Sequence, residues 1–531
     1  MSSRRLHHLI EQAAASMPDT AAVCFEGTSL NFRQFASAIR HAARCVCASS
    51  SPGGRVAVLA WNRTEYLTLL YAVPAAGRIA VPLNARLAPT EIVSQLHEAG
   101  VEVLIGEADL LAPLRTLLAD LPSLRARIAF GDEYQTWLDN APDSHETDPY
   151  TDGDEDPDPH ADETDTEVAW ILFTSGTTGR PKGAMLTHAS LLAALRSASD
   201  ARPVETNDVF LYPFPLFHVS AHNVLIQHLH ARTVVLVRSF DPPVVLDACR
   251  RYGVTTMSLA PTMIAMLLDH PTFSREALAT VRTIGYGASS IAESLLRRVM
   301  AETDVGLSQG YGMTELSGSV SFLDPDGHRM AVTEKPQLLR SAGRPVEGIE
   351  LRLVDDDLQD VAPGETGEIA VRAEQVIAGY WGQPELTAAT IVGGWLRTGD
   401  LGCFDDEGYL YIVDRKKDMI ITGGENVASR EVEDVLLAHP AVREVSVVGV
   451  PDAYWGEAVT AVVSLRPGLA EPNETTADAL VTHCRQLLAS YKKPRHIVFV
   501  DTVPVNANGK YEKRIVRALA VERLALPTTE T

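Results

Sequence analysis

The feature that most constrains the fold is an alternation of short apolar runs with amphipathic segments along most of the chain. Runs of strand length lie between predicted helices in the first 130 residues, and the alternation resumes at residue 169 and continues to about residue 410. Strands that alternate with helices form mainly parallel sheets covered on both faces. The sequence therefore predicts an α/β fold with a large N-terminal domain of layered sheets. The early strand-length runs are residues 55–60, 79–83, 101–105 and 128–130.

The C-terminal part has a different pattern, typical of a compact α+β unit. Residues 429–439 have the apolar spacing of an amphipathic helix, and strand-like runs follow at residues 442–450 and 458–465. The charged segment 414–418 separates the two patterns, and we expect a domain boundary there. The expected domains are residues 1–415 and 416–531.

The segment 141–167 interrupts the alternation with twelve acidic residues, four prolines and no lysine or arginine. Such a segment has too little apolar surface to offset its chain entropy, so we predict a disordered surface loop. A metal-binding acidic loop is the alternative, but the EF-hand spacing of carboxylates is absent.

The net charge of −23 makes nucleic acid an unfavourable partner, because a polyanion would be repelled. The six cysteines include no CxxC pair, which argues against a disulfide framework and a cysteine-rich zinc site. The sequence contains no apolar run of membrane-spanning length and no signal peptide, so we expect a cytoplasmic protein. The sequence is also compatible with peripheral membrane contact and with a homodimer.

The most informative segment is Phe173–Gly183, which follows the apolar strand 168–173. It combines four hydroxyl residues with Gly176, Gly179 and Lys182, so backbone N–H groups, hydroxyls and an ammonium can surround polyphosphate oxygens. The spacing differs from that of a Walker A loop, in which the lysine directly follows a glycine and precedes Ser or Thr. A P-loop kinase or GTPase is therefore disfavoured. The alternative to a phosphate-binding loop is an ordinary Gly-Thr turn without a binding role.

Thr174–Gly183 resembles the signature loop of the adenylate-forming superfamily, which includes acyl-CoA synthetases, firefly-type luciferases and peptide-synthetase adenylation domains. The resemblance extends over nearly the whole chain, because the other signatures occur in the family's order. These are Gln309–Glu315, Gly367–Ile369, Gly379–Trp381, Trp395–Asp400, Asp414–Arg415, Gly423–Val427 and Asn508–Lys510.

The resemblance implies a reaction in two halves, with ATP, Mg²⁺ and coenzyme A as cofactors. A carboxylate first attacks the α-phosphorus of ATP and forms an acyl-adenylate and pyrophosphate. A thiol then attacks the acyl carbon and displaces AMP. Chemistry of this kind depends mainly on positioning and on stabilising charge.

The same resemblance assigns nucleotide-binding roles. It implies that Tyr311 stacks on adenine, Thr314 contacts the α-phosphate, Glu315 and Thr174 hold Mg²⁺, and Asp400 accepts hydrogen bonds from the ribose. Each side chain also has an ordinary structural alternative, such as a core tyrosine, a helix N-cap or a turn aspartate. The expected ATP/AMP-binding residues are Thr174, Ser175, Gly176, Thr177, Thr178, Gly179, Lys182, Gly287, Ala288, Ser289, Gln309, Gly310, Tyr311, Gly312, Met313, Thr314, Asp400 and Arg415.

By the same resemblance, Lys510 bridges the attacking carboxylate and the α-phosphate during adenylation. The C-terminal domain is expected to be a mobile lid that turns about the hinge residue Lys417. That movement would withdraw Lys510 and bring Gly423, Gly424 and Glu425 to a tunnel for CoA. His218 matches the family's gate beside the carboxylate site, although a histidine in an apolar segment is more often structural.

The residues expected to line the acyl pocket are mostly small or apolar. Residues 217–223 contain no aspartate for the amino group of an amino acid, and we found no arginine pair for a dicarboxylate such as malonate. A fatty or other apolar acid therefore fits the sequence. The expected pocket residues are His222, Val224, Ala260, Pro261, Tyr286 and Leu316, with Gly287, Gly312, Met313 and Ser319 beside them.

The sequence therefore predicts an AMP-forming acyl-CoA synthetase. Segment 414–427 most resembles bacterial fatty-acyl-CoA ligases, which favours CoA as the acceptor. Two alternatives remain open, namely an acyl-AMP ligase that loads a carrier protein and a non-catalytic acyl or nucleotide sensor. Intact Lys182, Glu315, Asp400 and Lys510 argue against the sensor.

Overall fold

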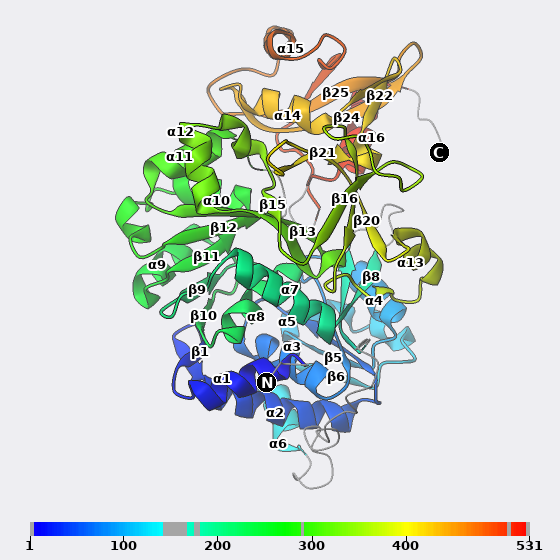
Figure 1. The fold of residues 1–531 in the computed structure, drawn as a ribbon. Helices are drawn as coiled ribbons and strands as arrows, with labels where there is room; N and C mark the ends of the chain where they lie inside the picture. The colour runs from blue at the N-terminus through cyan, green and yellow to red at the C-terminus, as the bar shows by residue number, and fades with distance from the viewer. Residues whose placement is uncertain are drawn as a thin grey trace.

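The computed structural model describes residues 5–141, 167–174, 181–287, 291, 293–506 and 511–526 (Figure 1). The acidic segment that we expected to be disordered lies outside these residues, except for its two ends at 141 and 167. None of the helices in the described part of the chain combines the length and apolar character needed to cross a membrane.

The first layer is a seven-stranded sheet in the order β18-β8-β7-β4-β3-β5-β6. Its strands from β7 to β6 are parallel, as the alternation predicted, whereas β8 and β18 are antiparallel to their neighbours. The strands are β3 (Arg55–Leu59), β4 (Ile79–Pro82), β5 (Val103–Gly106), β6 (Ala126–Ala129), β7 (Val168–Thr174), β8 (Lys182–Thr187) and β18 (Gly379–Tyr380).

The second layer is a nine-stranded sheet in the order β15-β14-β13-β12-β11-β9-β10-β1-β2. Its six central strands, β13 to β1, are parallel, and both edges are antiparallel. The strands are β1 (Ala21–Phe25), β2 (Thr28–Asn31), β9 (Val209–Tyr212), β10 (Thr233–Leu236), β11 (Thr256–Leu259), β12 (Thr283–Gly287), β13 (Gly306–Met313), β14 (Gly318–Leu323) and β15 (Arg344–Pro345).

Helices α3 (Thr64–Ala75) and α7 (His188–Ala201) contact strands of both sheets, and α8 (His222–Leu229) packs on the second. Ten of the twelve residues of α3 belong to the run Tyr66–Ala75, and all ten are buried, which fits a helix between two apolar layers. The other helices of this part are α1 (His7–Ser16), α2 (Phe32–Ser49), α4 (Pro89–Ala99), α5 (Ala108–Leu111), α6 (Asp132–Asp139), α9 (Pro242–Tyr252), α10 (Pro261–Asp269), α11 (Glu293–Glu302), α12 (Pro325–Thr333) and α13 (Pro384–Thr390).

The expected continuation of the α/β alternation to about residue 410 is wrong. After β15 the chain forms a separate antiparallel sheet in the order β16-β17-β20-β19, with β21 paired to β20. Short turns join β19 to β20 and β20 to β21, and in the second turn Asp405 Oδ1 accepts hydrogen bonds from the N–H groups of Glu407 and Tyr409. The strands are β16 (Glu350–Val354), β17 (Gly367–Arg372), β19 (Ile391–Val392), β20 (Trp395–Phe404) and β21 (Leu410–Arg415).

The C-terminal domain is a smaller α+β unit that lies above this antiparallel sheet in Figure 1. Its sheet has the order β23-β22-β25-β24, with β26 paired to β25. The domain has two apolar clusters of its own. The fold class is therefore confirmed. The elements are β22 (Ile420–Thr422), β23 (Glu425–Val427), α14 (Ser429–Leu437), β24 (Val442–Asp452), β25 (Gly456–Leu465), α15 (Glu474–Leu487), β26 (His496–Phe499) and α16 (Lys513–Arg523).

Candidate active site

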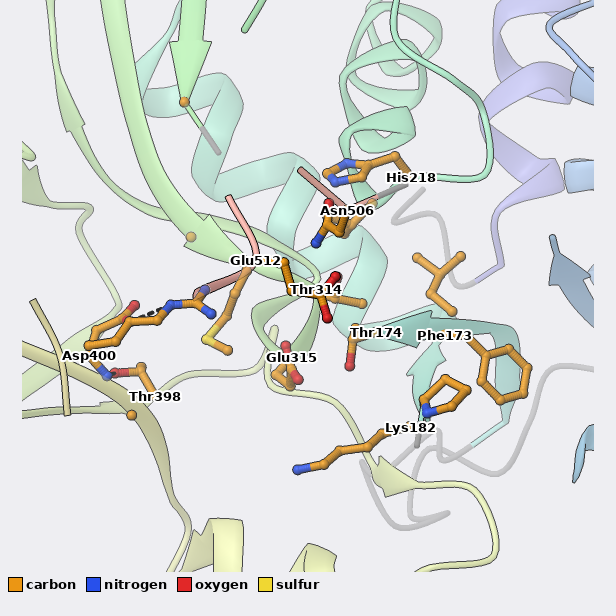
Figure 2. Close-up of a pocket in the computed structure, with 18 of the residues that line it drawn as sticks. Phe173, Thr174, Lys182, His218, Thr314, Glu315, Thr398, Asp400, Asn506 and Glu512 are labelled. Carbon is orange, nitrogen blue, oxygen red and sulfur yellow. Dashed lines mark hydrogen bonds and ion pairs between the residues drawn. The ribbon is translucent and has the colours of Figure 1, made fainter. Parts of the chain in front are cut away.

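A cavity of about 1600 Å³ lies where the large domain meets the C-terminal domain. Its walls come from the carboxyl ends of β7, β12 and β13, from the antiparallel sheet and from the C-terminal domain. Ligands of α/β proteins bind beyond the carboxyl ends of parallel strands. Figure 2 shows Thr398 and Asp400 on one side, Thr174 and Lys182 on the opposite side, and Thr314 between them.

The first side of the cavity is organised around Asp400. Asp400 on β20 is the direct register partner of Arg415 on β21, and the two side chains form an ion pair at 3.5 Å (Figure 2). The Tyr311 hydroxyl donates a hydrogen bond to Asp400 Oδ2 at 2.8 Å. Burial and the Asp400 carboxylate raise the pKa of Tyr311 well above its usual value, so the hydroxyl keeps its proton. Asp400 therefore has a fixed orientation and presents a carboxylate to the cavity.

A second carboxylate supports this side. Glu368 accepts hydrogen bonds from Arg397 Nη2 at 2.6 Å and from Lys416 Nζ at 3.0 Å. Burial alone would raise the pKa of Glu368, but these two cations lower it below its ordinary value. Glu368 thus holds Lys416, a residue of the expected hinge segment, against the large domain.

Glu315 lies on the floor between the two sides. It is 7% exposed, and the Tyr380 hydroxyl donates a hydrogen bond to its Oε1 at 3.0 Å. No described residue bonds to Oε2, and no described cation pairs with this carboxylate. Lys182 is nearby, with its ammonium 5.4 Å from the centre of the Tyr380 ring. A buried carboxylate without a cationic side chain as partner fits a bound Mg²⁺.

Lys182 and Thr174 are brought together by the β7–β8 hairpin, in which they are direct register partners. Both line the cavity. The rest of the expected loop, Ser175, Gly176, Thr177, Thr178 and Gly179, lies outside the described residues. So do Ala288 and Ser289, and so does Lys510.

The glycines of β13 are required by the neighbouring strand. A Cβ on Gly312 would lie 2.0 Å from the carbonyl oxygen of Gly318 on β14, and the register of the two strands shifts at this point. The backbones can approach only because no side chain is present there. Gly287, Gly310, Gly312 and Met313 line the cavity, whereas Gln309 and Tyr311 lie behind its surface.

The C-terminal domain closes the cavity. Asn506 and Tyr511, which flank the undescribed residues 507–510, both line it, and Val505 pairs with Tyr511 in an isolated bridge. Lys417 also lines it, and burial, together with Arg415 and Lys182, lowers its pKa. This end of the cavity therefore concentrates positive charge.

Gly423, Gly424 and Glu425, the expected CoA tunnel, do not line the cavity in this conformation. Gly423 and Gly424 form the exposed turn between β22 and β23 with φ angles of +61° and +84°, and the exposed Glu425 begins β23. Such backbone angles favour glycine. The structure thus explains both glycines as turn residues here.

The acyl end of the cavity contains two histidines. His218 lines it, and its Nδ1 accepts a hydrogen bond from the Ser220 N–H at 3.2 Å, which leaves the ring proton on Nε2. His222 donates from Nδ1 to the carbonyl oxygen of Val219 at 2.9 Å. Burial lowers the pKa of His222 to about 4, so this ring is neutral at physiological pH.

The expected acyl-pocket residues divide into two groups. His222 and Tyr286 line the cavity, together with Gly287, Gly312, Met313 and Ser319. Val224 and Leu316 are fully buried in the apolar core, and Ala260 and Pro261 begin α10 outside the cavity wall, so the structure contradicts these four assignments. Ser258 and Leu259, the last two residues of β11, line the cavity in place of Ala260 and Pro261, which follow them at the start of α10.

Several lining residues were not identified from the sequence as site residues. Glu368, Tyr380 and Thr398 belong to motifs that carried the resemblance, so their motif positions were a usable signal. Arg202 and Asn223 belong to no quoted motif. The sequence offered no signal for them.

The fold and the cavity together define an adenylate-forming enzyme. The family described as AMP-binding enzyme matches residues 10–381, and its C-terminal domain matches residues 431–510. The chain belongs to this family, which confirms the resemblance to acyl-CoA synthetases and agrees with ATP, Mg²⁺ and CoA as its cofactors.

Similar proteins differ in their acids. The chain is 35% identical to the fatty acid–[acyl-carrier-protein] ligase ScoC of Streptomyces coeruleorubidus over 97% of both chains. It is 36% identical to an indoleacetate–CoA ligase of Aromatoleum aromaticum over 99% of this chain and 100% of the other. Among solved structures, it resembles the o-succinylbenzoate CoA synthetase of Bacillus subtilis bound to its acyl-adenylate, with 29% identity, a TM-score of 0.82, and coverage of 96% and 97%.

Proposed function

We propose that this protein is an ATP-dependent carboxylate–CoA ligase, which converts an acid, ATP and CoA to acyl-CoA, AMP and pyrophosphate through an acyl-adenylate. The observation that carries the proposal is the single cavity that joins three groups: the Tyr311–Asp400–Arg415 cluster, the buried Glu315 carboxylate and Lys182. Each group suits one part of ATP, namely the nucleoside, the metal-bound phosphates and the phosphate charge.

In the first half-reaction the chain's own residues position and neutralise. Asp400 accepts hydrogen bonds from the ribose, and Lys182 and Thr314 contact phosphate oxygens. The triphosphate offsets the repulsion of the Lys417 ammonium by Arg415 and Lys182. Glu315 and Thr174 would hold Mg²⁺, which supplies charge stabilisation when bound. Lys510 would offset the charge that develops as the acid's carboxylate approaches the α-phosphate.

In the second half-reaction the C-terminal domain would rotate about Lys417. The exposed β22–β23 turn at Gly423 and Gly424 would then face the acyl-adenylate and admit CoA. The domain boundary near residue 416, the lid movement and the cytoplasmic location remain predictions of the sequence.

The acid is proposed to have an apolar body. Phe217, Val219, Leu259 and Tyr286 supply apolar surface around the acyl end. A fatty acid or another apolar carboxylic acid fits these walls. The named substrates of similar proteins include fatty, indole and feruloyl acids, so they support an organic acid without selecting one.

A carrier-protein acceptor is the second candidate. The similarity to a fatty acid–[acyl-carrier-protein] ligase favours it specifically. The discriminating experiment is a pyrophosphate-release and thioester screen over a panel of acids, with CoA, with holo carrier protein and with neither. Thioester formation with CoA supports the proposal, and formation with carrier protein alone supports the second candidate. ATP binding without pyrophosphate release for any of the acids would identify a sensor and contradict both.

The role of Lys510 gives a sharper test of the two half-reactions. Lys510→Ala should lower acyl-adenylate formation by about 1000-fold or more, since an ammonium beside two anions is lost. Thioester formation from preformed acyl-AMP should change little, because the lysine leaves the site before that step. Equal loss in both assays would refute the assignment.

A further inference from the structure

An arginine that the mechanism does not use lies at the acyl end of the cavity. Arg202 caps the C-terminus of α7 and precedes Pro203, which ends the helix there. Its side chain lines the cavity, and the residue is only partly exposed. Its hydrogen-bond contact is weak, from Nη1 to Asn223 Oδ1 at 3.5 Å.

No acidic side chain of the described residues pairs with Arg202. Burial lowers the pKa of its guanidinium to about 10, and no described carboxylate counteracts that effect. The group is nevertheless charged at neutral pH. A buried charge without a counter-ion costs several kcal/mol, as an order of magnitude, and is normally paired in proteins.

The guanidinium lies over a row of small residues on three adjacent strands. Ser258 on β11, Gly285 on β12 and Ser308 on β13 are register partners, so their side-chain positions share one face of the sheet. A Cβ on Gly285 would lie 2.9 Å from Arg202 Nη1. The glycine therefore provides the space that the arginine occupies.

The two serines add a second, independent observation. Ser258 and Ser308 are 5% and 1% exposed, and neither Oγ has a hydrogen-bond partner among the described residues. Two hydroxyl donors and a guanidinium therefore gather at one place, and a described carboxylate does not balance them. Buried polar groups normally have partners, so this arrangement lacks an acceptor with negative charge.

The position of Arg202 relative to the reacting centre determines what that acceptor is. Gly285 precedes Gly287 by two residues, which is about 7 Å along a strand. Gly287 and its register partner Gly310 line the cavity on the strands that lead toward Thr314, whereas Arg202 lies beside Gly285, two residues further from the carboxyl end of β12. An acid with its reacting carboxylate near Thr314 would extend its other end toward Arg202.

We propose that Arg202 binds a second carboxylate at the far end of the acid, so that the substrates are dicarboxylic acids with an apolar middle. The inference rests on the proposed function. It refines the expectation of a purely apolar acid, which followed from the lack of an arginine pair in the motifs.

The test compares α,ω-dicarboxylic acids with monocarboxylic acids of equal carbon number. The wild-type protein should release pyrophosphate with higher kcat/KM for the dicarboxylic member of each pair. Arg202→Met, which keeps the length and removes the charge, should lower the dicarboxylate-to-monocarboxylate ratio of kcat/KM by about 10- to 100-fold. Arg202→Lys should retain part of the preference.

Arg196→Met is the matched control. Arg196 is on the same helix but is exposed and paired with Glu374 at 3.2 Å, so its loss should leave the ratio unchanged. The thermal midpoint and ATP binding of each variant would show whether it folds. If Arg202→Met does not fold, the wild-type preference and the Arg202→Lys ratio decide.

The outcomes separate this inference from the proposed function. Equal use of both acid series by the wild type, or a ratio unaffected by Arg202→Met, would overturn the inference and leave the ligase intact. Equal loss for both series would place Arg202 at the reacting carboxylate and also overturn it. A failure of every acid tested to give pyrophosphate release would contradict the proposed function itself.

Discussion

The two ends of the cavity differ in how their polar groups are satisfied. At the nucleotide end, Asp400 has Tyr311 and Arg415 as partners, and Glu368 holds Lys416. At the acyl end, the Arg202 guanidinium lacks a described carboxylate partner. At the first end the protein itself holds Asp400 and Glu368 in place, and Glu315 is left for a metal ion, whereas the second end leaves a positive charge for the acid to complete. The protein's own contacts thus fix the groups that bind ATP. The selection of the acid depends on Arg202, for which the described residues supply no carboxylate partner.

The strongest way to sharpen this contrast is to change the proposed metal ligand at the nucleotide end. Glu315→Gln keeps the size and the acceptor for Tyr380 but removes the negative charge. We expect kcat for pyrophosphate release to fall by about 1000-fold, since charge stabilisation by a metal is worth several kcal/mol. The loss should be the same for every acid.

The control for that change is Glu374→Gln, an exposed carboxylate that pairs with Arg196. It should retain wild-type activity. Mg²⁺ titrations should show a weaker apparent affinity for Glu315→Gln. A loss that depends on the acid would contradict the separation of the two ends.

A smaller effect is expected from Asp400→Ala, which removes the acceptor that Tyr311 and Arg415 share. Because two charge-assisted contacts and the proposed ribose contact are lost, kcat/KM for ATP should fall by about 100-fold. Tyr311→Phe removes only one hydrogen bond and should cost about fivefold. Steady-state kinetics at saturating acid would measure both, and equal effects would show that the tyrosine hydroxyl, not the carboxylate, is essential.

The sequence predicted the nucleotide end better than the acyl end, for a physical reason. Asp400 and Arg415 belong to motifs because their roles depend on common ligand chemistry. Arg202 is separated by 83 positions from Gly285, and only the tertiary fold places this C-cap residue of α7 beside β12. Val224 and Leu316 were expected in the pocket but are fully buried in the core, and an apolar side chain suits either place, so the sequence does not distinguish a pocket wall from a core.

The fold shows the same division. The parallel strands followed from the alternation of apolar runs with helices, and the C-terminal unit from its change of pattern. The antiparallel sheet of β16, β17, β19, β20 and β21 was missed, because the connections between its strands do not repeat the strand–helix alternation that marks parallel strands. Yet that sheet carries both Asp400 and Arg415 as register partners.

A still smaller change tests the acyl end without removing its charge. Gly285→Ala would place a methyl group 2.9 Å from Arg202 Nη1 and displace the guanidinium. We expect the dicarboxylate-to-monocarboxylate ratio to fall by about tenfold, while the KM for ATP stays within about twofold. Gly253→Ala, at the C-cap of α9, is the control. An added methyl group there would strain the backbone, because φ is positive, but would contact no neighbouring atom, so the ratio should not change. An equal fall in kcat/KM for dicarboxylic and monocarboxylic acids would contradict an effect confined to Arg202.

The smallest expected effect concerns pH. His222 lies in the field of Arg202, and burial lowers the pKa of His222 to about 4. With an ordinary pKa of about 6.5, His222 would gain a proton as the pH falls through that value, add a second positive charge at the acyl end and raise the dicarboxylate preference. Because its pKa is depressed, the ring stays neutral well below neutrality. The dicarboxylate-to-monocarboxylate ratio should therefore change by less than about twofold between about pH 8.5 and about pH 6.5. Ratios of kcat/KM cancel the pH dependence of adenylation itself, so a ratio that rises severalfold over this range, and becomes flat in His222→Gln, would show that the acyl end acquires a second charge.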